Sequence, residues 1–133
     1  MNLFTYQIET HEKQDFIFLD DYIADALSKS SVQDGIMVIY SPHTTAGITI
    51  NENADPDVRR DLKLGLNKAF PNDPDYVHFE GNSDGHMKSS LIGASETLII
   101  KDGRPILGTW QSIYFGEFDG PRTRTIYIKI VEG

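Results

Sequence analysis

Three of the four histidines lie in two polar segments of the chain. His43 lies three residues after the apolar run 36–40, and His78 and His86 bracket a segment rich in glycine and carboxylates. Neutral imidazole binds zinc and similar ions, and it also transfers protons near neutral pH. These residue types predict either a metal site or a proton-transfer site, shared by the two segments.

A metal site is the first interpretation. The chain has no cysteine, so its ligands would be nitrogen and oxygen atoms, which suit a divalent ion such as Zn or Mg. The expected ligands are His43, His78 and His86, with positions left for water or substrate. Carboxylates would hold the rings in one tautomer; the candidates are Glu52, Glu80 and Asp84. The spacing matches no HxH or HExxH pattern, so separate hydrogen bonding of each histidine stays open.

Acid–base catalysis is the second interpretation, with His43 or His86 as the proton-transferring group. Glu52 would orient the ring, and Asp84 completes the expected catalytic set. Asn51 and Asn53 flank Glu52 just before an expected helix. They are therefore interpreted either as substrate ligands or as helix-capping residues.

Anion binding is the third element. The helix start at Asp55-Pro56 and the glycine-rich segment 81–85 present backbone amides, which favour anions. Segment 116–122 is interpreted either as a solvated turn or as part of the site wall. The chain has no GxxxxGK[ST] or GxGxxG motif. The expected substrate-binding residues are Thr44, Thr45, Asn51, Asn53, Asn82, Glu117 and Arg122.

Composition narrows the classes of partner. A formal net charge of −8 argues against a broad nucleic-acid interface, but a small anionic ligand remains compatible with it. The start of the chain does not resemble a signal peptide. The longest apolar run, 36–40, is too short to cross a bilayer. We therefore expect a cytoplasmic protein without membrane or nucleic-acid partners.

Residue patterns predict one α+β domain over residues 1–133, with a mostly antiparallel or mixed sheet of about seven strands and about three helices. Segments 3–9 and 15–19 are expected to pair as a hairpin. Asp55 should cap a helix that begins at Pro56 and ends before Pro71. The other expected elements are a helix over 20–30, a short helix over 86–93, and strands over 36–40, 46–51, 95–101, 104–108, 109–118 and 123–131.

Several motifs together resemble the YjbQ-like family, and they cover essentially the whole chain. They are SPHTTAG at 41–47, NENAD at 51–55, His78 with GNSDGH at 81–86, GTWQ at 108–111 and EFDGPR at 117–122. The resemblance implies an α+β fold, a homotrimer with polar pockets near subunit boundaries, and a weak, secondary thiamine-phosphate synthase activity. That reaction joins a pyrimidine pyrophosphate to a thiazole phosphate and releases pyrophosphate.

Three hypotheses for the function follow. The leading one is an enzyme that acts on a small phosphorylated or otherwise anionic metabolite, with transferase activity of the thiamine-phosphate type. The alternatives are a metal-dependent hydrolase and a non-catalytic trimer that binds a small molecule.

Overall fold

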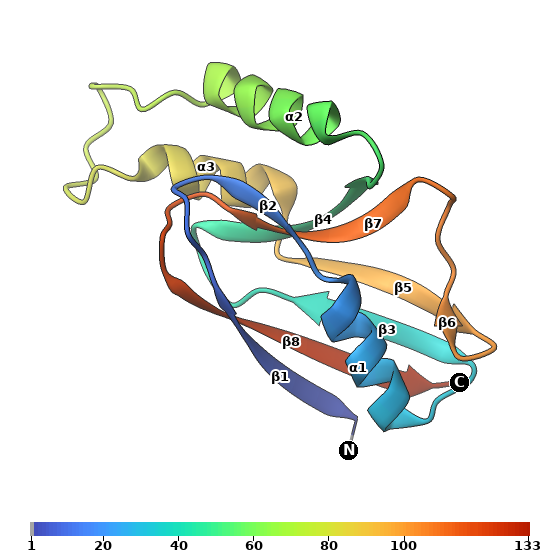
Figure 1. Cartoon of the computed structure of the whole chain (residues 1–133). Helices are drawn as coiled ribbons and strands as arrows, with labels where there is room; N and C mark the ends of the chain where they lie inside the picture. Colours follow the sequence, from blue (N-terminus) through green and yellow to red (C-terminus); the bar gives the residue numbers. More distant parts are fainter. Residues whose placement is uncertain (1) are drawn as a thin grey trace.

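Two antiparallel β-sheets and three α-helices make up the computed structural model, which describes residues 2–133 (Figure 1). The strands are β1 (Leu3–Glu9), β2 (Asp15–Phe18), β3 (Gly35–Tyr40), β4 (Ala46–Glu52), β5 (Ser95–Lys101), β6 (Arg104–Pro105), β7 (Gln111–Glu117) and β8 (Thr123–Glu132). The helices are α1 (Asp20–Ser30), α2 (Pro56–Ala69) and α3 (Ser83–Ile92). The predicted α+β class is confirmed.

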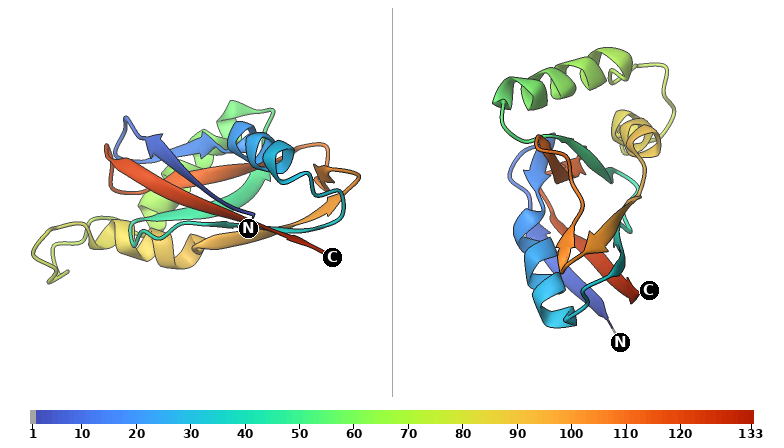
Figure 2. Two further views of the ribbon diagram at one scale, coloured as in Figure 1. Left: turned by 90° about the horizontal axis from the view of Figure 1, so that it is seen from below. Right: turned by 90° about the vertical axis from the view of Figure 1, so that its right-hand side faces the viewer.

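The elements form layers. The larger sheet has the order β1-β8-β3-β5-β6, and the smaller one has the order β2-β7-β4. Helices α2 and α3 lie over the outer face of the smaller sheet, while α1 lies at the side of the two sheets (Figures 1 and 2). Within residues 2–133, no helix has the length and apolar character needed to span a bilayer.

Alternating side chains on the strands build the main core between the sheets. Ile126, Ile128 and Ile130 of β8 face Ile113 and Phe115 of β7, and all five are buried. Such alternation is expected where a strand has one face on a core. Strand β7 is covered on both faces, because its other side chains meet α2 and α3.

A second, smaller core joins the two helices to the sheet. Tyr114, Phe16 and Phe118 pack edge to face, with ring centroids about 6.0 to 6.3 Å apart, and Leu66 of α2 covers them. Helix α2 begins as the sequence predicts, since Asp55 accepts a hydrogen bond from the backbone N–H of Asp57 (2.9 Å).

Two predictions about local structure were wrong. Segments 3–9 and 15–18 are strands but do not pair, since β1 pairs with β8 and β2 pairs with β7. The segment between them therefore crosses from one sheet to the other. Helix α3 begins at Ser83, three residues before the expected start at His86, and no side chain caps it. His86 thus lies within the first turn of α3 and is not its first residue.

Candidate functional site

A polar cavity of about 360 Å³ lies where three connecting loops meet. Those loops are 41–45, 70–82 and 118–122, and α3 and β8 complete the walls. A cavity of this size is within the range of small-molecule sites. Its walls consist of Pro42, His43, Thr44, Thr45, His78, Glu80, Asn82, His86, Arg122 and Arg124. The structure therefore brings both histidine segments to one place, as the sequence predicts.

A buried ion pair supports the cavity from the core side. The Arg124 guanidinium donates to both carboxylate oxygens of Glu117, at 2.8 Å from Nε and at shorter range from Nη2. Thr10 Oγ1 and the Asp119 N–H also donate to this carboxylate. Burial alone would raise the pKa of Glu117, but these hydrogen bonds hold it below its ordinary value. Glu117 is fully buried, so its carboxylate positions Arg124 and is not itself exposed to a ligand.

A second arginine is fixed at the rim of the cavity. Arg122 donates through Nε to the Asp119 carbonyl and through Nη2 to the Asp119 carboxylate, both at 2.7 Å. Asn82 Nδ2 donates to the same carboxylate oxygen (2.8 Å). Two of the expected ligand residues thus meet through Asp119, and the Nη1 donors of Arg122 are left for a bound group.

His43 is held as a neutral imidazole. Its Nε2 accepts a hydrogen bond from the backbone N–H of Thr125 (2.9 Å), so the ring proton is on Nδ1. Burial lowers the pKa of His43, and the charge of Arg124 lowers it further. The ring therefore offers the cavity an N–H donor instead of a basic nitrogen.

We expect His43 to be in the Nδ1-protonated form at pH 7 and to gain a second proton only below its ordinary pKa of 6.5. Long-range ¹H–¹⁵N spectra of the imidazoles measure both properties directly. Because the pKa is lower in the folded chain, the stability that the neutral ring contributes is complete above pH 6.5 and is lost as the pH falls. An Nε2-protonated ring at pH 7 would contradict this assignment.

His78 and His86 approach each other without His43. Their rings lie 5.3 Å apart and nearly perpendicular, and Glu80 is 3.7 Å from Nε2 of His78. No three His, Asp or Glu side chains among residues 2–133 are placed to hold a metal ion together. The metal site expected from His43, His78 and His86 is therefore not formed by the described residues. Nε2 of His43 is engaged by the Thr125 amide, so only its Nδ1 could face a ligand.

The Asn51-Glu52-Asn53 segment lies far from the histidines. Strand β4 places Ala46 at the cavity end and Glu52 at the other end, about 20 Å away at roughly 3.4 Å per residue. Glu52 accepts from the Ala54 N–H, and Asn53 Nδ2 donates to the Gln111 carbonyl. Asn51 and Glu52 are the last residues of β4, and Asn53 begins the connection to α2, so Glu52 does not orient a histidine of the same chain.

Asp84 also lies outside the cavity wall. It is buried on the inner side of α3, close to Lys88, and its Oδ1 has no donor within residues 2–133. Lys88 donates to Gln14 and Asn67, which links α3 to α2 and to the loop between β1 and β2. Asp84 is thus placed to act on the charge of Lys88, not on the reacting groups of a ligand. Of the expected threonines, Thr44 is exposed in the cavity, while Thr45 is buried and accepts from Arg124.

Arg124 is the residue that the sequence interpretation missed. A signal for it was present, since Arg124 continues the inward-facing series of Ile126 and Ile128 at a spacing of two. Glu117 continues the series of Ile113 and Phe115 in the same way. Two opposite charges on inward-facing positions of consecutive segments indicate a buried ion pair, and the structure forms it between β7 and β8, which belong to different sheets.

Comparisons with known proteins agree with this architecture. Residues 4–133 match the family model described as UPF0047 protein YjbQ-like. A UPF0047 protein of Methanocaldococcus jannaschii is 57% identical over 129 residues, covering 97% of this chain and 94% of that one. The UPF0047 protein YugU of Bacillus subtilis is 50% identical, covering 96% and 97%.

Solved structures show the same fold. An uncharacterised conserved protein of the YjbQ/UPF0047 family from Clostridium acetobutylicum is 52% identical, with a TM-score of 0.94 and coverage of 96% and 99%. A hypothetical protein from Aeropyrum pernix has the same TM-score at 29% identity and covers both chains fully. The chain belongs to the UPF0047 protein YjbQ-like family.

Proposed function

We propose that this protein is an enzyme acting on a small phosphorylated metabolite, with the phosphate bound at the wall formed by His43, Arg122 and Arg124. The observation that carries the proposal is the neutral His43 ring beside two arginines that carboxylates hold in place. Donors fixed in advance stabilise negative charge without reorganisation. The overall charge of the chain does not prevent this, because local donors dominate at short range.

The proposed reaction class is the release of a phosphate or pyrophosphate leaving group, as in a thiamine-phosphate-type transfer. Breaking the bond to pyrophosphate leaves negative charge on its oxygens. The two guanidinium groups and the Nδ1–H of His43 would stabilise that charge. His86, whose ring lies on the cavity wall, is the group proposed to transfer a proton.

Calorimetric titration with inorganic pyrophosphate tests the anion site. We expect Arg122→Gln to weaken binding by about tenfold to a hundredfold, since hydrogen bonds to charged groups contribute about 1.5–3 kcal/mol. Arg60→Gln, at an exposed position of α2, is the matched control and should bind as the wild type does. Equal affinity of all three proteins would refute the anion site.

Pyrophosphate release from the two thiamine precursors tests the reaction. Ligand binding with no product would favour the non-catalytic alternative.

We also propose that the protein is a homotrimer. The outer face of the larger sheet carries a row of neighbouring apolar residues, Ile99, Ile36 and Val131, which are 60%, 42% and 45% exposed. Exposed apolar patches are typical of association sites. Light scattering should give about three times 15.0 kDa, and Ile36→Glu should reduce the mass to that of one chain. A wild-type mass near 15.0 kDa would contradict the trimer.

A metal-dependent hydrolase is the second candidate, favoured by the His78–His86 pair. Two imidazoles on one tetrahedral zinc ion place their ring centres about 5 Å apart, given Zn–N bonds of about 2.0–2.1 Å. The observed 5.3 Å is close to this value. In this candidate His78 and His86 would be two of the metal ligands, and the other positions would be taken by water or substrate. Titration with Co²⁺, followed by its visible absorption, should show one site that His78→Ala removes; no binding would exclude this candidate.

A further inference from the structure

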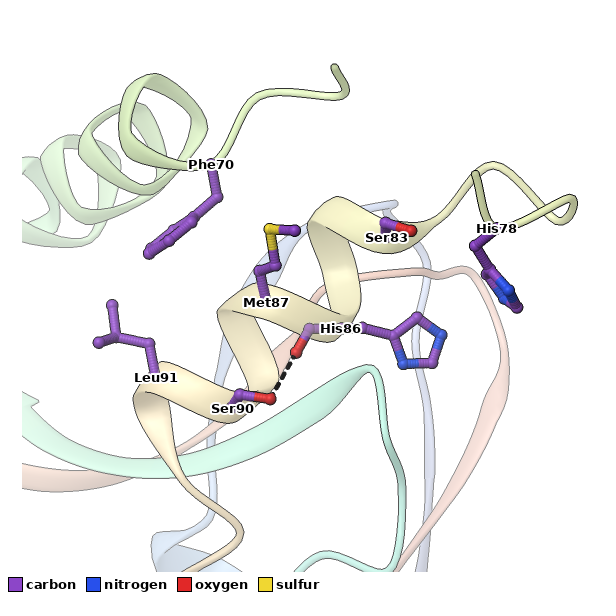
Figure 3. A pocket seen from close by; sticks show the side chains of 7 residues that line it. All are labelled: Phe70, His78, Ser83, His86, Met87, Ser90 and Leu91. Carbon is purple, nitrogen blue, oxygen red and sulfur yellow. Dashed lines mark hydrogen bonds between the residues drawn. The ribbon is translucent and has the colours of Figure 1, made fainter. Parts of the chain in front are cut away.

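An apolar cavity adjoins the polar one at helix α3, and the two share His78 and His86 as lining residues. The apolar cavity has a volume of about 660 Å³ and lies between α3 and the end of α2 (Figure 3). The remaining walls of the apolar cavity are Phe70, Ser83, Met87, Ser90 and Leu91.

Helix α3 presents a polar stripe and an apolar stripe to the two cavities. His86 and Ser90 are four residues apart and form a polar stripe along α3, while Met87 and Leu91 form the adjoining apolar stripe. Figure 3 shows Phe70 at the end of α2 facing Met87 and Leu91, whereas His86 points towards the loop that carries His78. Leu91 is 62% exposed, so its side chain is open to contact with a bound apolar group.

We propose that the ligand has two parts: a phosphate in the polar cavity, and a small aromatic or branched apolar group between Phe70, Met87 and Leu91. The phosphate part rests on the proposed function. The apolar part rests on the position of the apolar cavity, which shares His78 and His86 with the polar one. In this arrangement the bond between the two parts of the ligand lies beside His86, where a proton can be transferred.

Three probes of increasing apolar size test the proposal by calorimetry: inorganic phosphate, methyl phosphate and benzyl phosphate. Benzyl phosphate should bind about tenfold more tightly than methyl phosphate, because its ring is removed from water. Leu91→Ser should remove most of that gain and leave methyl phosphate unchanged. Leu64→Ser is the matched control, since Leu64 is 48% exposed on α2 and lines neither cavity.

The outcomes separate the two proposals. If methyl and benzyl phosphate bind equally, or if Leu91→Ser weakens both by the same factor, the two-part ligand is refuted and the phosphate site stands. If none of the three probes binds, the proposed function fails, and the two-part ligand fails with it.

Discussion

Replacing Arg124 with methionine is expected to destabilise the fold by about 3–5 kcal/mol, the cost of leaving a buried charge without its partner. Glu117 is fully buried, so its carboxylate is poorly placed to gain water in place of the lost donors. The free energy of unfolding, measured in urea, gives the size of the effect. In the double variant Arg124→Met with Glu117→Gln the loss should be smaller than the sum of the single losses, because no carboxylate is then left unpaired.

The control for this experiment is the exposed ion pair of Lys29 and Asp25. These side chains lie 2.9 Å apart but are 60% and 44% exposed, so Lys29→Met should cost about 0.5 kcal/mol or less. A loss of stability in Arg124→Met near that of Lys29→Met would show that the pair does not support the core.

The pKa of Glu117 is lower in the folded state than its ordinary value of 4.5. The contribution of Glu117 to stability is therefore present above pH 4.5 and is lost as the pH falls.

His86→Ala is expected to lower turnover by about 10² to 10⁴, the usual range for a residue that transfers a proton in the transition state. The assay is the steady-state release of pyrophosphate from the thiamine precursors. We expect kcat to fall more than KM changes, because the arginines that bind the anion remain in place. His43→Ala should instead raise KM as well, since the Nδ1–H of His43 is expected to contact the phosphate.

His11→Ala serves as the matched histidine control. His11 is exposed in the loop between β1 and β2 and lines none of the cavities described above, so its removal should leave turnover unchanged. Unchanged turnover in both His43→Ala and His86→Ala would mean that the measured activity does not belong to this site.

Much of the fold could be predicted because local signals and the fold agree. The Asp55-Pro56 helix start and the strand over 123–131, with its alternating isoleucines, each have a short-range physical cause. The pairing of 3–9 with 15–19 was predicted wrongly because the choice of partner is a long-range matter. Both segments pair with strands more than 90 residues away in sequence, and no short motif encodes that choice.

In the candidate site, too, some features could be predicted from the sequence and others could not. His43, His78, His86, Asn82 and Arg122 do line one cavity, as expected from their motifs. Glu52 does not join them, because it lies at the opposite end of β4 from the cavity, where its carboxylate accepts from the Ala54 N–H at the start of the connection to α2. The hydrogen-bond partner of His43 could not be predicted from the sequence, because the amide of Thr125, which fixes the ring, is 82 residues away.

The central claim is that the wall of His43, Arg122 and Arg124 binds a phosphate group. Titrating ¹⁵N-labelled protein with inorganic pyrophosphate tests it most directly, by following the Nδ1–H signal of His43 and the Nε–H signal of Arg122. We predict saturable shifts of both signals, with the amides of Glu52 and Asn53, at the other end of β4, unchanged. Saturable shifts confined to that distant turn, or no shift at His43 and Arg122 at millimolar pyrophosphate, would contradict the account.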